Sequence, residues 1–538
     1  MWKRNKWTAA PLILGAGLIL SACGGSDSGG EAAKEVAVNP EGFPIVDEPV
    51  SMSIFGPSTA VAAWEDMQFF EEMEKLTNVQ LEFTTPNLES LETQKNLMFA
   101  SGDYEDILFA SSLTLEEQVD YGNQGILIPL NDLIEEHAPN IQNMLDEYPE
   151  VEKVITATDG NIYALPNVNK GISWARGPLW YNNDWLEALN VEELPKTTDE
   201  LYELLKRFKT EDPNGNGEAD EIPLTAFKIE DIRQWFLGAF GHLDPGVEVI
   251  DGEVMFGAMQ PGYKAYLEYM NKLYSEGLLD PESFSQTGDQ KKAKGQANQI
   301  GLFADWFPHF TLGGDDSSTE NPMMHPVTSN FIDEPMLPKS DGISPGQFAI
   351  TSANPYPEVA IRWVDYLYSK EGSTLLNIGK EGVLWEWENE AEGIRTHNEL
   401  PSQYTSHEEW RGSLTPDFGI PTPKLAYPEI DLSWADNEFT KFTHEETAEK
   451  FEPYAQVALP QMFLTGEEQS EVSRIRADLD AFVEQMEAKF ITGQRPLSEW
   501  DDYVATIEDM RVGRLLEIYE GAYERFNSAG TDSEEESE

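Results

Sequence analysis

The sequence contains a single cysteine, Cys23, in 538 residues. A disulfide framework, a cysteine-ligated zinc site and a cysteine nucleophile in the body of the chain are therefore excluded. Basic side chains are also scarce, because 36 Lys and Arg stand against 98 Asp and Glu, for a formal charge of −62. This deficit excludes a protein that binds nucleic acid, or an anionic lipid surface, through clustered cations.

Common catalytic motifs are missing as well. The sequence has no HExxH, GxSxG, Walker A or GxGxxG pattern, and its seven histidines form no close pair. Glycosidases use a pair of Asp or Glu side chains. With 98 carboxylates such pairs occur by chance, so their presence does not identify a glycosidase here. Hydrophobic residues nevertheless make up 40% of the chain and aromatics 11%, which predicts a folded protein of two to four domains or lobes.

The first residues have the pattern of an export signal. No charge occurs between residues 7 and 26, and residues 11–20 form a short apolar run. This run is too short and too rich in glycine to span a membrane comfortably, but it is typical of a secretory signal. Three cations precede it: Lys3, Arg4 and Lys6.

The apolar run ends in Leu-Ser-Ala-Cys at residues 20–23, which resembles a bacterial lipobox. The only cysteine stands where the lipobox requires the thiol that receives a diacylglycerol. We therefore predict a lipoprotein signal peptide over residues 1–22, lipidation of Cys23 and a flexible, glycine-rich tether over residues 23–44. The alternative is an ordinary signal peptide with an incidental cysteine.

Strand and helix patterns alternate in the first third of the body. Residues 51–55, 79–83 and 107–110 are typical of strands, and residues 67–76 and 91–100 are typical of helices. This β-α-β-α-β order predicts a parallel sheet with covering helices, in which ligands bind beyond the carboxyl ends of the strands.

The C-terminal part is predicted to be helical. Apolar residues between 475 and 490 follow helical spacing, and Gly493 is placed to end that helix. A last helix is expected to bury apolar residues from Tyr503 to Tyr519. The polar, acidic residues 528–538 are expected to form a disordered tail.

Four segments, in this order and spacing behind a lipobox, resemble the family-1 extracellular solute-binding proteins of bacterial ABC importers. They are ASGDYEDI at 100–107, GILIPLNDL at 125–133, DGNIYALP at 159–166 and LWYNNDWL at 179–186. The length and the helical C-terminal part also resemble the Gram-positive oligosaccharide-binding lipoproteins and the alginate-binding proteins.

The resemblance implies an α/β, two-lobed fold of the periplasmic-binding-protein type II kind with a helix-rich C-terminal part. Residues 45–168 with about 300–355 are expected in one lobe, and residues 169–299 with about 356–527 in the other. It further implies a monomer, lipid-anchored on the extracellular face of the cell membrane. There it would capture an oligosaccharide between the lobes and deliver it to ABC permease subunits, without acting as an enzyme.

Residues 212–221, Asp-Pro-Asn-Gly-Asn-Gly-Glu-Ala-Asp-Glu, have the spacing of a calcium loop. EF-hand loops supply oxygens from positions 1, 3, 5, 7 and 9 around a glycine at position 6. The corresponding residues are Asp212, Asn214, Asn216, Glu218 and Asp220, with Gly217 at the turn. Pro223 stands where an EF-hand has its bidentate Glu, so Glu221 is the expected substitute. We predict a structural Ca²⁺ site, similar to the calcium loop of the alginate-binding proteins; a metal-free turn is the alternative.

Saccharide sites combine aromatic faces with polar side chains that bind hydroxyls. Tryptophans in loop contexts are the candidates, and we predict that at least two of them contact ligand: Trp64, Trp174, Trp306, Trp385 and Trp387. Core packing remains the alternative for each one.

Two other function classes are compatible with these patterns. A secreted carbohydrate-active enzyme, such as a lyase or a glycosidase, would also suit a lipid tether and a tryptophan-rich site. A sensor would bind the sugar without delivering it.

Overall fold

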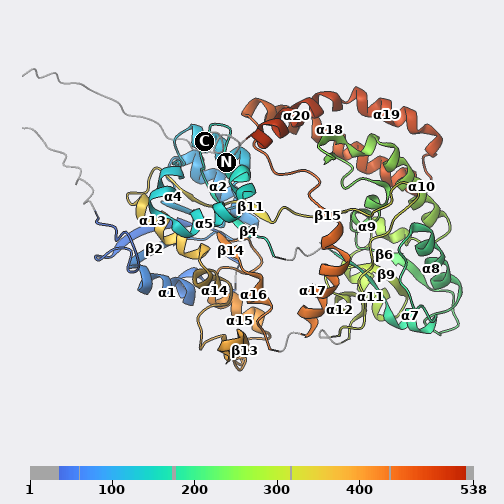
Figure 1. Ribbon diagram of the computed structural model, residues 1–538, viewed down its shortest axis with the longest axis horizontal. Coiled ribbons are helices and arrows are strands. Elements are labelled where there is room, and N and C mark those ends of the chain that lie inside the picture. Colours follow the sequence, from blue (N-terminus) through green and yellow to red (C-terminus); the bar gives the residue numbers. More distant parts are fainter. Residues whose placement is uncertain (1–35, 60, 172–176, 315–317, 436–437, 529–538) are drawn as a thin grey trace, which may run out of the picture. The chain divides into compact units, whose positions relative to one another are not determined.

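The computed structural model describes residues 36–59, 61–171, 177–314, 318–435 and 438–528 (Figure 1). The predicted signal peptide, Cys23 and the tether up to residue 35 lie outside the described residues. Trp174 and the acidic tail from residue 529 onward lie outside them too.

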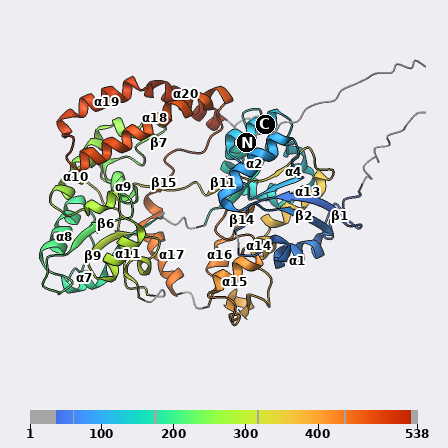
Figure 2. The same ribbon diagram turned by 180° about the vertical axis from the view of Figure 1, so that it is seen from behind.

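A six-stranded sheet forms the first of two larger sheets, and its strand order is β14-β4-β11-β3-β1-β2. Its strands are β1 (Val50–Phe55), β2 (Val79–Thr84), β3 (Ile107–Phe109), β4 (Leu165–Asn169), β11 (Ile343–Ile350) and β14 (Lys424–Ala426). β1 pairs in parallel with both β2 and β3, so the predicted parallel β-α-β-α-β unit is confirmed; Figure 2 shows β1 and β2 side by side.

Helices cover this sheet, and two of them connect its first three strands. α1 (Gln68–Thr77) buries Phe69, Phe70 and Met73 and ends at Asn78, whose φ of 61° is left-handed. α2 (Leu91–Ser101) ends at Gly102. The other helices of this part are α3 (Leu115–Asn123), α4 (Asn131–His137), α5 (Pro139–Glu147), α6 (Pro149–Ile155), α13 (Pro357–Asp365), α14 (Lys370–Ile378), α15 (His407–Leu414) and α16 (Pro428–Asp431).

The second larger sheet has three strands in the order β5-β9-β6. β9 (Ile300–Ala304) lies between β5 (Leu179–Tyr181), which is antiparallel to it, and β6 (Ile222–Thr225), which is parallel to it. All five residues of β9 are buried, as expected for a central strand.

Helices surround this second sheet too. A capping box of Thr197 and Glu200 begins α8 (Thr198–Thr210). The other helices of this part are α7 (Asn183–Ala188), α9 (Ile229–Phe236), α10 (Pro261–Ser275), α11 (Gly288–Gln296), α12 (Pro308–Leu312) and α17 (Glu438–Lys450). Two short two-stranded sheets accompany them: β7 (Val247–Ile250) with β8 (Glu253–Phe256), and β10 (Leu337–Pro338) with β15 (Ala455–Gln456).

The C-terminal helices share one hydrophobic core with this second sheet. α18 (Gly466–Ile491) contains the predicted apolar stripe and is followed by Gly493 at φ 72°. The single last helix predicted from Tyr503 to Tyr519 is instead two helices, α19 (Trp500–Asp509) and α20 (Val512–Ser528). The chain turns between them at Arg511, whose φ of 70° is left-handed and incompatible with a continuous helix.

Strand pairing corrects the expected assignment of segments. The predicted lobe boundary near residue 300 put residues 300–304 in the same lobe as the first sheet. These residues form β9, which pairs with β5 and β6 of the second sheet. β14 was expected with the second part but pairs with β4 of the first sheet, and α14 packs against it. After β9 the chain therefore returns to the first sheet at β11. It adds β14 to that sheet before it continues into the C-terminal helices.

Candidate functional site

Two exposed aromatic side chains follow adjacent strands of the three-stranded sheet. Because β6 and β9 are parallel neighbours, with Thr225 opposite Phe303, their carboxyl ends meet at one edge of the sheet. Phe227 and Trp306 each stand two residues beyond the end of a strand, with 41% and 49% of the side chain exposed. This is the edge at which open α/β sheets bind ligands.

The turn that carries Trp306 is fixed by Asp305. One carboxylate oxygen of Asp305 accepts a hydrogen bond from the backbone N–H of Trp306 at 2.8 Å. The other accepts one from Nζ of Lys291 at 2.8 Å, and Lys291 also donates to the carbonyl of Ala304 at 2.6 Å. Nε1 of Trp180 donates to the carbonyl of Asp305 at 3.0 Å. The backbone beneath the exposed indole is thus held at several points.

Further aromatic side chains lie directly after Trp306. The rings of Phe307 and His309 stack at 5.6 Å, and Phe310, 46% exposed, meets Phe307 edge-on at 5.2 Å. Phe227, Trp306 and Phe310 are three of the eight large exposed hydrophobic side chains in the described part of the chain.

A buried polar network holds the loop that carries Phe227. The N–H of Ala226 donates to Oγ of Ser283 at 3.2 Å, and Nε2 of Gln286 donates to the carbonyl of Ala226. Nζ of Lys228 lies 5.5 Å from the centre of the Phe227 ring. Phe227 was not among the predicted contact residues, which were all tryptophans. Its position two residues after the short apolar segment that forms β6 is the signal that would have identified it.

The predicted calcium loop lies at the opposite, amino edge of the same sheet. It runs directly into β6, and the N–H of Ile222 donates to the carbonyl of Gln299 just before β9. Nε2 of Gln299 donates to Oδ2 of Asp220 at 2.7 Å, and this hydrogen bond holds the pKa of Asp220 below its ordinary value. β6 spans four residues, so the two edges are about 13 Å apart at roughly 3.3 Å per residue.

Side chains and backbone of the loop form one tight network. The carboxylate of Asp212 accepts hydrogen bonds from the N–H groups of Asn216 and Gly217, both at 3.1 Å. Nδ2 of Asn214 and Nδ2 of Asn216 both donate to Oδ1 of Asp220, at 3.1 and 3.0 Å. Hydrogen bonds thus join the side chains of positions 3 and 5 to that of position 9, and the side chain of position 1 to the backbone of positions 5 and 6.

The oxygens of this loop suit a hard cation. Oε1 of Glu221 is buried and has no hydrogen-bond partner among the described residues, which is costly for a carboxylate unless another group satisfies it. Calcium is bound by carboxylate, amide and backbone oxygens, which are the donors present here. In the described ranges no three His, Cys, Asp or Glu side chains form a metal-binding group by themselves, so amide and backbone oxygens have to contribute.

The other predicted contact residues are in different surroundings. Trp64 is fully buried, stacked on Phe70 at 5.1 Å and edge-on to Phe109 at 5.6 Å, so no indole face is open to a ligand. Trp385 is 4% exposed, and its Nε1 donates to the carbonyl of Gly379 at 3.1 Å. Both are core side chains, which is the alternative that the sequence had left open.

Trp387 is half-buried beside Trp385, at 5.2 Å between ring centres. The Arg395 guanidinium lies 4.3 Å from the centre of the Trp387 ring and covers that face. Four of the five predicted tryptophans lie in the described residues, and Trp306 is the most exposed of these four, at 49%.

Comparison with known proteins identifies the family. The profile of the bacterial extracellular solute-binding proteins matches residues 56–374. This chain belongs to that family. The match covers β2, β3, β4 and β11 of the six-stranded sheet and the whole three-stranded sheet, including both edges described above.

Relatives with known ligands cover nearly the whole chain. The fructooligosaccharide ABC transporter substrate-binding protein FusA of Streptococcus pneumoniae is 26% identical over 550 residues, 98% of this chain and 99% of that protein. The structure of FusA in complex with kestose matches 89% of this chain and all of that one, with a TM-score of 0.71 and 25% identity. An EF-hand mutant of FusA in complex with fructo-nystose matches with a TM-score of 0.70, 26% identity and the same coverage of both chains.

These relatives are substrate-binding proteins and not enzymes, and the chain has their α/β fold. Within the residues that the structure describes, no helix combines the length and the apolar character needed to cross a bilayer.

Proposed function

We propose that this protein is the substrate-binding component of an ABC importer and that it captures a neutral oligosaccharide, with fructooligosaccharides as the first candidates. The observation that carries the proposal is the pair of exposed aromatic side chains, Phe227 and Trp306, at the carboxyl ends of adjacent parallel strands. Aromatic faces of this kind stack on the apolar C–H surface of sugar rings. The family membership and the FusA similarity support transport as the purpose of binding.

The predicted Ca²⁺ ion would be held at the amino edge by Asp212, Asn214, Asn216, Glu218, Asp220 and Glu221. The unpartnered Oε1 of Glu221 and the existence of an EF-hand mutant of FusA support this assignment. The distance between the two edges of the sheet argues that the ion stabilises the loop and the start of β6 and does not touch the sugar.

We further propose that lipid on Cys23 anchors the protein at the extracellular face of the membrane. The lipobox pattern before the only cysteine of the chain supports this assignment. From that position the protein would deliver its sugar, as a monomer, to the permease subunits of the importer.

A thermal-shift screen of the full chain, solubilised in detergent, tests the proposal. Binding to the native state raises the unfolding temperature by mass action. We expect kestose and fructo-nystose to raise it and uronate oligosaccharides of equal length to leave it unchanged. A panel in which only uronate oligosaccharides act, or in which no sugar acts, contradicts the proposal.

A further inference from the structure

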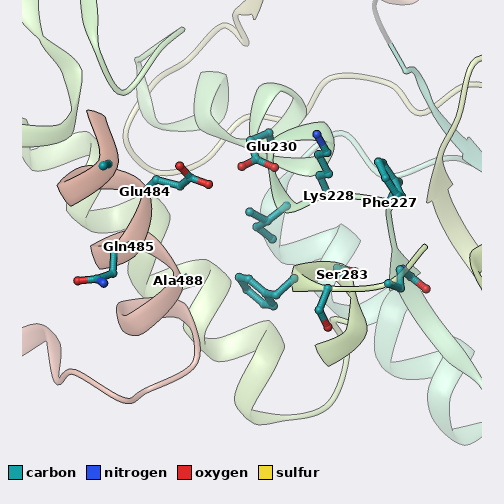
Figure 3. Close-up of a pocket in the computed structure, with 12 residues that line it drawn as sticks. Phe227, Lys228, Glu230, Ser283, Glu484, Gln485 and Ala488 are labelled. Carbon is teal, nitrogen blue, oxygen red and sulfur yellow. The ribbon is translucent and has the colours of Figure 1, made fainter. Parts of the chain in front are cut away.

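A pocket of about 540 Å³ opens directly beside Phe227. This volume is within the range of roughly 300–1,000 Å³ that small-molecule sites occupy. Its walls come from the loop after β6, from residues 283–286 and from α18 (Figure 3). In Figure 3, Glu484 projects from α18 toward Glu230, while Phe227, Lys228 and Ser283 lie on the other side.

The topology places this pocket at the end of the aromatic edge, which is the carboxyl edge of the three-stranded sheet that carries Phe227 and Trp306. In the sheet, β6 lies next to β9. On the other side of β6, Leu279 forms a parallel bridge with Leu224. Each step across a sheet is about 4.8 Å. The groups beyond the strands therefore follow in the order Trp306, Phe227, Ser283, and α18 stands next to the last of these as a wall.

The wall is fixed to the same elements that carry the aromatic edge. Glu487 of α18, only 1% exposed, pairs with the Arg233 guanidinium of α9 and accepts a 2.9 Å hydrogen bond from Oη of Tyr266 of α10. Burial raises the pKa of Glu487, an effect that the Arg233 charge opposes. Nδ2 of Asn271, also in α10, donates to the carbonyls of Phe490 and Ile491 at 3.1 and 3.0 Å. A wall held in this way is preorganised.

The polar groups in the pocket favour an uncharged sugar unit. Glu230 and Glu484 face each other across it, and Lys228 is the only cation among the lining residues. Carboxylates accept hydrogen bonds from sugar hydroxyls, but two of them repel the carboxylate of a uronate. Phe227 and Phe284 supply apolar faces beside them.

We propose that this pocket is the terminal subsite of the saccharide site. It holds the neutral sugar unit at one end of the chain, and α18 blocks any further unit. The protein thus recognises the end of a short oligosaccharide and not the interior of a polymer. This inference rests on the proposed function, because it assumes that the sugar lies along the aromatic edge.

Substitutions on the exposed face of α18 test the subsite. Ala481 is exposed and lines the pocket, so Ala481→Trp fills the pocket without disturbing the core. Arg474→Trp is the matched control, since Arg474 is exposed on the same face two turns earlier, about 10 Å away along the helix. In calorimetric titrations of the full chain with kestose and fructo-nystose, we expect Ala481→Trp to weaken binding at least tenfold and Arg474→Trp to leave it unchanged. Equal affinities for Ala481→Trp and the unmodified chain overturn the subsite and leave the proposed function standing.

Stoichiometry on a long linear fructan tests end recognition separately. We expect one protein molecule per fructan chain, independent of chain length. Several molecules per chain, in proportion to its length, overturn the proposal, because interior units would then be bound. If neither kestose nor fructo-nystose binds the unmodified chain, the inference falls together with the function on which it rests.

Discussion

Two tryptophans follow strands at the carboxyl edges of the two larger sheets, and their surroundings differ. Trp64 follows β1 of the six-stranded sheet and is fully buried, whereas Trp306 follows β9 of the three-stranded sheet and is 49% exposed. Gly56, directly after β1, explains the burial. A Cβ at residue 56 would lie 2.4 Å from Cη2 of Trp64, so the indole occupies the space that the missing side chain leaves.

Trp306 follows a turn of a different kind. Its preceding residue, Asp305, accepts hydrogen bonds from Lys291 and from the N–H of Trp306 itself. The indole of Trp64 is therefore a core side chain that contributes to stability, whereas the indole of Trp306 is exposed and available for binding.

The largest effect is expected from Trp64→Ala. Removing a fully buried indole leaves a cavity and typically costs about 3–5 kcal/mol of the free energy of unfolding. Chemical denaturation measures this loss, and Trp64→Phe, which keeps an aromatic ring at the position, serves as the milder control. A Trp64→Ala chain as stable as the unmodified one would remove the distinction between the two tryptophans.

Calcium removal tests the amino edge of the three-stranded sheet. Calcium at a hundred times its dissociation constant is expected to stabilise the fold by about 2.7 kcal/mol, and a chelator should abolish that gain. Asp212→Ala should lower the unfolding temperature and make it independent of calcium.

Asp251→Ala is the matched control for the calcium loop. Asp251 is an exposed turn residue with a φ of 53°, close to the 48° of Asp212, but it lies outside the loop. It should retain the full response to calcium. Unfolding curves of the unmodified chain that coincide with and without chelator would leave the loop a metal-free turn.

Trp306→Ala tests the carboxyl edge. Truncating a stacked aromatic side chain in a binding site typically costs about 2 kcal/mol, close to a thirtyfold loss of affinity. We expect this loss for kestose, with stability unchanged because the indole is half exposed. Phe331→Ala, which removes an equally exposed aromatic side chain elsewhere, should change neither quantity. Unchanged kestose affinity in Trp306→Ala would place the sugar elsewhere.

The smallest effect on the folded protein is expected from Cys23→Ala. Because lipid attachment needs the thiol, the substitution should release the chain from the membrane fraction. It should leave the unfolding temperature unchanged. Fractionation of cells followed by a salt wash measures the release. Retention of the variant in the washed membranes would contradict lipid anchoring.

Local patterns predicted local structure well. The alternation at 51–55 and 79–83 and the apolar stripe of α18 depend on neighbours within a few residues, and the structure has each of them. Residues 212–221 connect α8 to β6, and calcium binding there stays a prediction.

What local patterns could not predict depends on distant residues. The pairing of β9 with β5, and the return of β14 to the first sheet, join strands more than a hundred residues apart, and the pairing of β9 with β6 is also distant in sequence. The burial of Trp64 depends on Gly56 and on aromatic rings from α1 and β3. Phe227 became a candidate only when the parallel pairing of β6 with β9 placed it beside Trp306.

The fate of a bound sugar distinguishes a binding protein from an enzyme. The full chain is incubated with kestose, the complex is separated from free sugar, and the sugar is then released and examined by chromatography. We expect one kestose per protein molecule, recovered intact after prolonged incubation. Shortened or unsaturated products would establish an enzyme, and the absence of any retained sugar would contradict a fructooligosaccharide-binding protein.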